Sequence, residues 1–127
     1  MIKINIVEND KIVSLIELNG HANYASSGSD IVCSGVTTAT YTTINLLDRL
    51  DKTYYQLEVK DPDGYLKLTI NNDLVKVADQ KTVKLIIDNL IDMYKMLEED
   101  YPKNLKINYR RLPWLDLIYN YSHLKKV

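Results

Sequence analysis

The sequence of 127 residues has little cysteine and histidine: Cys33 is the single cysteine, and His21 and His123 are the two histidines. One cysteine cannot form a disulfide within the chain, which suits a reducing compartment, so we expect a cytoplasmic protein. One cysteine also excludes a zinc site built from several cysteines. Two histidines about a hundred positions apart provide weak material for any other metal site, and we expect none.

The chain also has little net charge, and it has no long apolar runs and no repeats. Its 16 basic and 17 acidic residues leave a net charge of −1, so the whole molecule gives no electrostatic reason to bind nucleic acid directly. No apolar run approaches the roughly 20 residues that span a bilayer, so we expect no membrane contact. The first residues enter an alternating pattern directly, and we expect no signal peptide. With 46% hydrophobic and 26% charged residues, the chain fits one globular domain.

Alternating apolar residues predict two strands at the start of the chain. Ile2, Ile4 and Ile6 alternate with polar residues, as in a strand with one buried face. A turn over 8–11 follows, and a second strand completes a hairpin that ends at Gly20. The predicted buried face of this second strand consists of Ile12, Ser14, Ile16 and Leu18.

Two helices are predicted further along the chain. The first covers residues 30–50, with Asp30 as its N-cap. Its threonines are poor helix formers, so buried apolar side chains must hold it, and the threonine hydroxyls are expected to bond back to the preceding turn. The expected buried residues are Val36, Ala39, Ile44, Leu47 and Leu50. The second helix covers 79–100 and ends before Pro102. Its buried stripe is predicted as Val83, Ile87, Leu90, Tyr94 and Leu97.

Three further strands complete the prediction, at 54–60, 65–70 and 105–109, with a turn at 61–64 between the first two. Residues 74–78 fit either a strand continuation or a linker. The order strand–strand–helix–strand–strand–helix–strand predicts an α+β fold, with two main helices packed on a mostly antiparallel sheet. We place one domain at 1–111. Residues 112–127 have apolar residues at near-helical spacing, which predicts a short C-terminal helix that either packs on the domain or binds a partner.

Cys33 and His21 lie on the two sides of a small, polar segment, 23–29, which is expected to be a loop. A thiol at the start of a helix is favoured as thiolate, because the first amides lack partners and the peptide dipoles stabilise an anion. These residue types fit a cysteine nucleophile with a histidine partner. Each residue alone has a simpler interpretation, since a lone cysteine is commonly a small buried hydrophobe and a lone histidine a surface residue. We interpret His123 as such a surface residue.

Two motifs, Gly20-His21-Ala22 and Gly28-x-Asp30-Ile31-Val32-Cys33-x-Gly35, resemble the signature of the ribosomal-processing cysteine proteases (Prp). The resemblance covers about residues 1–110. It implies a cysteine endopeptidase that removes a short N-terminal extension from a large-subunit ribosomal protein, number twenty-seven, before that protein enters the ribosome. It also implies a homodimer that needs no cofactor.

The same resemblance assigns roles to residues of the two motifs. Cys33 is the expected nucleophile, and His21 is the expected general acid and base that returns the proton to the leaving amine. Asp30 would orient the site or cap the helix. The predicted substrate-binding residues are Gly20, Ala22, Gly28, Ser34, Gly35 and Thr37. Thr37 stands where the family usually has serine, which leaves its role in substrate binding open.

A second class of function is a non-catalytic, ribosome-associated module that assists assembly or binds a peptide as an added strand at a sheet edge. The presence of both His21 and Cys33 argues against it, because a binding module has no use for a thiol paired with an acid–base group. A redox sensor built on Cys33 would lack a resolving cysteine within the chain.

Overall fold

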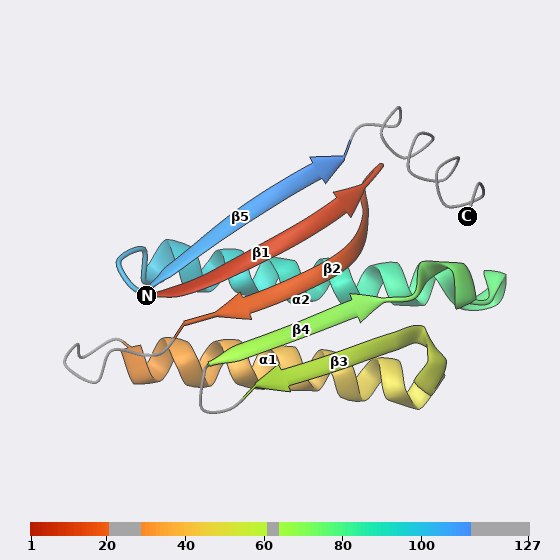
Figure 1. The fold of residues 1–127 in the computed structure, drawn as a ribbon, viewed down its shortest axis with the longest axis horizontal. Coiled ribbons are helices and arrows are strands. Elements are labelled where there is room, and N and C mark those ends of the chain that lie inside the picture. Colours follow the sequence, from red (N-terminus) through yellow and green to blue (C-terminus); the bar gives the residue numbers. More distant parts are fainter. Residues whose placement is uncertain (21–28, 61–63, 113–127) are drawn as a thin grey trace.

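The structure, a computed structural model, describes residues 1–20, 29–60 and 64–112 of the chain. In this part of the chain, two long helices cover one face of a five-stranded sheet (Figure 1). The strands are β1 (Ile2–Asn9), β2 (Ile12–Asn19), β3 (Tyr55–Lys60), β4 (Tyr65–Ile70) and β5 (Leu105–Leu112). The helices are α1 (Ser29–Leu50) and α2 (Gln80–Asp100). The predicted α+β class and order of elements are confirmed.

The strands lie in the order β3-β4-β2-β1-β5. Neighbouring strands are antiparallel except β1 and β5, which run parallel, with Ile2 opposite Leu105. The parallel pair follows from the path of the chain, because α2 provides the long crossover that parallel strands require. The sheet is therefore mostly antiparallel, as predicted. Neither of the described helices is long and apolar enough to cross a membrane.

In the hairpin of β1 and β2, Ile12 does not lie on the buried face as predicted. The pairing register shifts directly after Val7, and Ser14 is the extra residue of a β-bulge. Beyond the bulge Val13 turns into the core, whereas Ile12 is 53% exposed. The prediction that Ile12 belongs to the buried face is wrong, because a bulge interrupts the two-residue alternation on which it was based.

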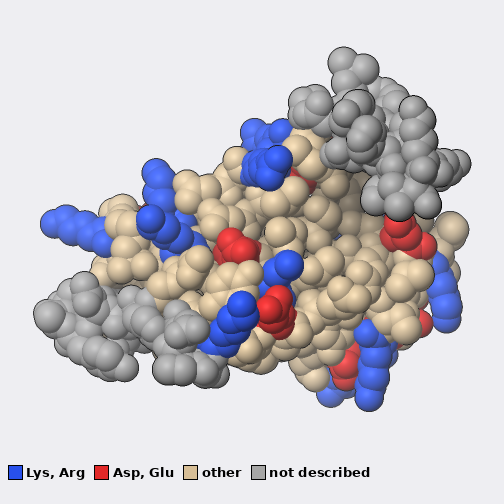
Figure 2. Space-filling model, viewed as in Figure 1, with Lys and Arg blue, Asp and Glu red and all other residues tan. Residues whose placement is uncertain are grey.

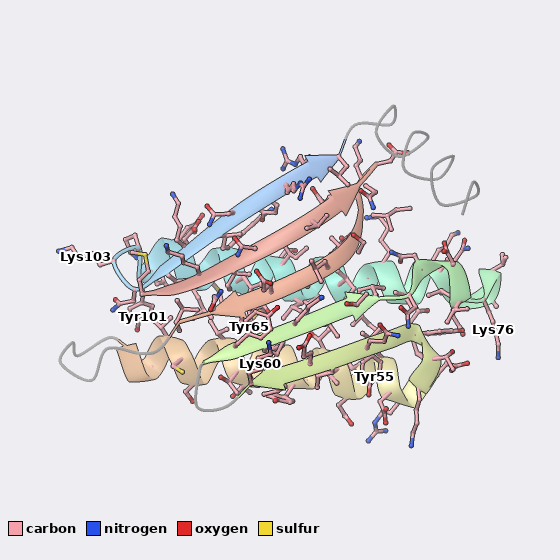
Figure 3. The ribbon with its side chains drawn as sticks, viewed as in Figure 1. Tyr55, Lys60, Tyr65, Lys76, Tyr101 and Lys103 are labelled. Atoms are coloured by element: carbon pink, nitrogen blue, oxygen red, sulfur yellow. The ribbon has the colours of Figure 1, made fainter. Side chains whose placement is uncertain are left out.

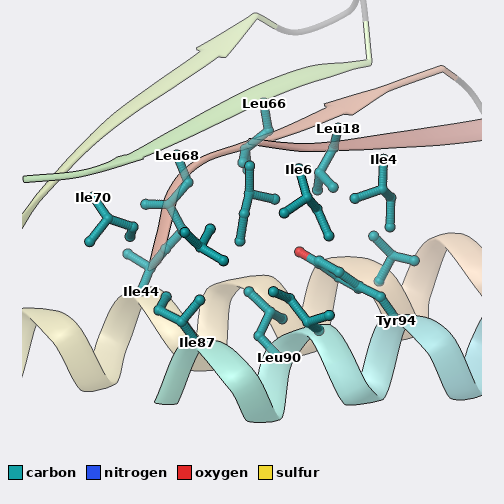
Figure 4. Packing of buried hydrophobic residues seen from close by; sticks show 14 of the residues in the cluster. Ile4, Ile6, Leu18, Ile44, Leu66, Leu68, Ile70, Ile87, Leu90 and Tyr94 are labelled. Atoms are coloured by element: carbon teal, nitrogen blue, oxygen red, sulfur yellow. The ribbon is translucent and has the colours of Figure 1, made fainter. Parts of the chain in front are cut away.

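One apolar core fills the space between the sheet and the helices (Figure 4). Each inner strand contributes every second side chain, and each helix contributes one stripe. The strand residues in the core include Ile2, Ile4, Ile6, Ile16, Leu18, Leu66, Leu68 and Ile70. The helix residues include Val32, Val36, Ile44, Leu47, Val83, Ile87, Leu90 and Tyr94. Leu50 was predicted to be buried, but it ends α1 and is 36% exposed.

Hydrogen bonds between buried hydroxyls join α1 to α2. Thr40 donates to the carbonyl of Val36 at 2.7 Å, so the Tyr94 hydroxyl, 2.5 Å from Thr40 Oγ1, is the donor in the bond between the helices. Thr43 donates to the carbonyl of Ala39 at 3.0 Å. These bonds confirm that threonines of α1 bond back to the preceding turn. Burial of the Tyr94 hydroxyl raises its pKa well above the usual range, which keeps it a donor.

The segment between β4 and α2 is a linker. It contains two short 3₁₀ turns, Asn72–Leu74 and Val77–Asp79, and no strand, which decides between the two alternatives left open by the sequence. The buried Tyr54 holds this linker in place, because its hydroxyl donates to Asp79 at 2.5 Å and accepts from the amide of Lys76 at 3.3 Å. Of the loop predicted at 23–29, Ser29 already belongs to α1, and the remainder lies outside the described residues.

No described helix covers the other face of the sheet, which carries basic and acidic side chains side by side (Figure 2). A polar row crosses four strands on this face. Asn108 donates to Asn5 at 3.3 Å, Asn5 donates to Glu17 at 3.2 Å, and Tyr65 donates to the second oxygen of Glu17 at 2.8 Å. The bond to Glu17 stabilises the neutral phenol and raises the pKa of Tyr65 to about 12.

Gly20 follows β2 with a φ of +113°, in a region that side-chain-bearing residues rarely adopt. A Cβ atom at this position would overlap the carbonyl oxygen of Met1. The Gly20 amide donates to the carbonyl of Gly64 at 3.1 Å. One glycine therefore joins the start of β1, the end of β2 and the start of β4, and it sets the direction in which the chain leaves the sheet.

We predict that Thr40→Val destabilises the protein more than Tyr94→Phe. The first change leaves a buried hydroxyl on Tyr94 without its acceptor and should lower the free energy of unfolding by about 1–3 kcal/mol. The second removes the donor but leaves Thr40 bonded to Val36, and should cost about 0.5–1.5 kcal/mol. Urea unfolding of both variants measures the two values. A larger loss for Tyr94→Phe would contradict the assignment of donor and acceptor.

We also predict that Gly20→Ala lowers the free energy of unfolding by about 1–3 kcal/mol, because alanine is strained at this φ and its methyl group meets backbone. The matched control is Gly35→Ala in α1. A Cβ there meets only the flexible end of the Leu97 side chain, at 3.3 Å. Thermal unfolding compares the two variants, and equal midpoints would show that the close approach at Gly20 is not required.

Candidate active site

The cavity that contains the thiol lies where β2 ends and β4 begins, against the first turns of α1. It has a volume of about 290 Å³ and brings together Cys33, Gly20 and Thr37, three residues predicted from the sequence. The other lining residues are Ile2, Leu18, Val36, Tyr41, Val59, Gly64, Tyr65 and Leu66. None of these described residues carries a charge, so the cavity is mostly apolar, with hydroxyl groups and one thiol.

Cys33 is a half-buried free thiol whose neighbours on α1, Val32 and Val36, are fully packed in the core. The prediction that Cys33 lies in the first turn of the helix is wrong. Because α1 already begins at Ser29, Cys33 is its fifth residue and begins the second turn. The first four amides of a helix lack carbonyl partners within it, and in α1 all of these precede Cys33. Any amide that α1 offers to an oxyanion therefore comes from the turn before the thiol.

The side chains of four predicted site residues lie outside the described part of the structure. His21, Ala22 and Gly28 lie outside the described residues. The prediction of Asp30 as the N-cap of α1 is wrong, because α1 begins at Ser29 and Asp30 is its second residue. The side chain of Asp30 lies outside the described part of the structure. The other roles assigned to these residues remain predictions. Among the described residues, no group of three His, Cys, Asp or Glu side chains lies close enough together to hold a metal ion.

Ser34 and Gly35 lie on a different face of α1 from the thiol cavity. Both line a groove of about 920 Å³ between the outer surfaces of α1 and α2. A Cβ on Gly35 would lie 3.3 Å from the side chain of Leu97, so this glycine allows α2 to pack closely. Ser34 and Gly35 therefore lie beside α2, and their contact with substrate remains a prediction.

Thr37 and Tyr41 extend the row of α1 that begins at Cys33. Residues four apart share a helix face, so the spacing 33, 37, 41 was a signal in the sequence for Tyr41, which we had not assigned to the site. Tyr41 lines the cavity and is 44% exposed. The contributions of Val59 and Leu66 were not predictable in this way, because they depend on which strands lie beside α1.

A basic side chain at the end of β3, Lys60, and an aromatic one at the start of β4, Tyr65, lie next to the cavity. The ammonium group of Lys60 lies 5.4 Å from the ring centre of Tyr65, and Figure 3 shows both where the two strands approach the start of α1. A cation near the face of an aromatic ring is attracted to its negative charge density. The contact helps to hold the two strand ends together beside the cavity.

Several solved structures share this fold, and two of them are structures of one protease. An essential ribosomal processing protease Prp from Staphylococcus aureus, in complex with a substrate peptide, superposes with a TM-score of 0.73 at 23% identity. The same S. aureus protease with a covalently linked product peptide superposes with a TM-score of 0.71 at 24% identity. In both comparisons 87% of this chain and 100% of the other are covered. At these identities the likeness concerns the fold.

Sequence comparison identifies the family. The family model of the cysteine protease Prp matches residues 1–106. The ribosomal processing cysteine protease Prp of Bacillus subtilis (strain 168) is 33% identical over 98 residues, which cover 77% of this chain and 87% of that protein. The thiol in its cavity, the shared fold and the match over most of the chain agree, and the protein belongs to the Prp family of cysteine proteases.

Proposed function

We propose that this protease removes the N-terminal extension of the large-subunit ribosomal protein number twenty-seven during ribosome maturation. The name of the B. subtilis relative as a ribosomal processing protease supports the proposal, as does the substrate peptide bound by the S. aureus structure of the same fold. The observation that carries it is the cavity of about 290 Å³ with Cys33 in its wall. A module that only binds peptides would not need this thiol.

The chemistry starts with the sulfur of Cys33, which as a thiolate attacks the carbonyl carbon of the cleaved peptide bond. The C–N bond breaks, a thioester forms on Cys33, and His21 gives the thiol proton to the leaving amine. A water molecule then hydrolyses the thioester and restores the thiol. The position of Gly20 in the wall of the cavity supports the pairing, because His21 is the next residue in the chain. The covalently linked product peptide of the S. aureus protease agrees with a covalent step in that relative.

The walls of the cavity favour a substrate with an apolar side chain beside the cleaved bond. Val36 and Leu66 are buried at 2% and 7% exposure, and Leu18 at 8%, so they form an apolar floor. An apolar side chain gains free energy by leaving water for such a site, whereas a charged one would lose its hydration without a partner.

We also propose a cytoplasmic homodimer that uses no cofactor. The groove between α1 and α2 supports the dimer, because it exposes apolar side chains, with Ile31 57% and Leu46 41% exposed. Asp30 is proposed to orient the site or to stabilise the start of α1. Ala22 and Gly28 are proposed to contact substrate, and Thr37 to do so with its hydroxyl from the wall of the cavity.

We predict that Cys33→Ala and Cys33→Ser abolish cleavage of the ribosomal precursor while the fold is retained, because each replacement is small enough for the same half-buried position. His21→Ala should lower kcat by about 10²–10⁴-fold, as expected for loss of a general acid and base. Cleavage is followed by mass spectrometry, and thermal unfolding checks the fold. Cleavage by Cys33→Ala at a rate near that of the wild type would refute the proposed nucleophile.

A truncation tests the proposed domain boundary. β5 continues to Leu112, one residue past the predicted end of the domain at 111, so the chain should be ended after Leu112. We expect the shortened protein to cleave the precursor at nearly the full rate, because the residues assigned to catalysis precede α2. Residues 113–127 contain Trp114, Leu115 and Ile118, and we expect their removal to lower the thermal midpoint or to change the mass in solution. Loss of cleavage in a folded, shortened protein would place the tail in the substrate site.

A further inference from the structure

The two edges of the sheet differ in how well they are protected. At β5, the carboxylate of Glu98 accepts the amide of Ile107 at 2.6 Å, so α2 satisfies part of that edge. Lys95 and Arg111 also lie over the ring of Tyr109, at 5.7 and 5.2 Å. Proteins commonly block edge strands in such ways, because an open edge can pair with another chain. β5 is therefore a guarded edge.

β3, the opposite edge, has a comparable ring contact, that of Lys60 with Tyr65. Among residues 1–20, 29–60 and 64–112, however, no helix side chain bonds to its backbone as Glu98 bonds to β5. The six residues of β3 pair with β4 on one side only, and every second residue directs its N–H and C=O away from β4. None of the hydrogen bonds from side chains of the described residues reaches these outward groups. The strand contains no proline and no bulge that would prevent another strand from pairing with it.

The side chains of β3 that face the helices are apolar and incompletely covered. Leu57 and Val59 pair with the buried Leu68 and Leu66, yet they are 38% and 40% exposed. α1 therefore leaves an apolar strip along the edge of the sheet. Such a strip suits alternate apolar side chains of an added strand, whose backbone would pair with β3.

This strip leads to the thiol. Tyr55 at the start of β3 donates to Asp48 near the end of α1 at 2.7 Å, and Val59 near the end of β3 lines the cavity of Cys33. β3 and α1 thus run in opposite directions, with the end of β3 approaching the start of α1 (Figures 1 and 3). Val59 therefore places the end of this edge next to the cavity of Cys33.

We propose that the substrate polypeptide binds as an additional strand on the free edge of β3 and passes from there over Cys33. This inference rests on the proposed protease function. The backbone bonds to β3 hold the substrate extended, and Leu57, Val59 and Tyr41 contact its alternate side chains. The substrate is the chain expected on this edge, because Val59 belongs both to the edge strand and to the cavity wall that contains the thiol. Binding through backbone groups also presents the cleaved bond in an extended form.

A backbone N-methyl scan tests the proposal directly. Synthetic peptides covering the N-terminal extension and cleavage site of the organism's ribosomal protein twenty-seven are made with one N-methyl group each. Their binding to Cys33→Ala is measured by fluorescence anisotropy, so that binding is separated from cleavage. We expect losses of about tenfold or more at every second residue on one side of the cleaved bond, where an amide bonds to β3, and small effects at the residues between them. Uniform or absent effects along that side would overturn the proposal.

Side-chain variants of β3 test whether the substrate binds at this edge of the sheet. Leu57→Lys and Val59→Lys should each raise KM for the unmodified peptide by about tenfold or more, since they place a charge in the apolar strip. The matched control is Val77→Lys, because Val77 is 83% exposed and lies in the linker before α2. All variants must keep the thermal midpoint, and Leu57→Lys and Val77→Lys, which lie outside the cavity wall, must also keep the rate at which iodoacetamide alkylates Cys33. Unchanged KM in both β3 variants would contradict binding at this edge.

The same experiments separate this proposal from the proposed function. If the wild type does not cleave the peptide and Cys33→Ala does not bind it, the ribosomal substrate is wrong. If cleavage occurs but neither the N-methyl scan nor the β3 variants show the expected pattern, the protease function stands and strand addition at β3 is refuted.

Discussion

The packing of α1 against the sheet and α2 fixes the position of the thiol. Helical propensity alone would hold α1 poorly, because threonine is a weak helix former, so its conformation depends on burial. Val32 and Val36, on either side of Cys33, are 0% and 2% exposed, and the buried bond between Thr40 and Tyr94 ties the helix to α2. A helix anchored in this way cannot turn the thiol away from the end of β2.

Different faces of α1 consequently serve different purposes. The face with Val32 and Val36 completes the core. The row from Cys33 through Tyr41 borders the cavity, where Gly20 arrives from the sheet in a conformation that excludes a side chain. The face with Gly35 allows close contact with α2. Core, site and helix contact thus depend on one element, and a change that loosens α1 should affect stability and catalysis together.

The sequence predicted the elements better than the contacts between them. The strands and the buried stripe from Val83 to Tyr94 followed from alternation and helical spacing. The bulge at Ser14, which exposes Ile12, was not predicted because a local pattern cannot show where a register shifts. Among the residues of the site, Cys33 and Gly20 were found through their motifs. Val59 joins the cavity only through the order of strands, a long-range property that no local pattern contains.

The central claim, that Cys33 in this cavity is the nucleophile of a protease, is tested most directly by covalent labelling. A peptide that ends at the cleaved bond of the ribosomal precursor and carries a chloromethyl ketone is incubated with the protein, and the product is analysed by intact mass and peptide mapping. We predict one adduct per chain, on Cys33, which forms in parallel with the loss of cleavage and faster than with a scrambled peptide. Full labelling of Cys33 with cleavage unchanged, or equal labelling by the scrambled peptide, would contradict it.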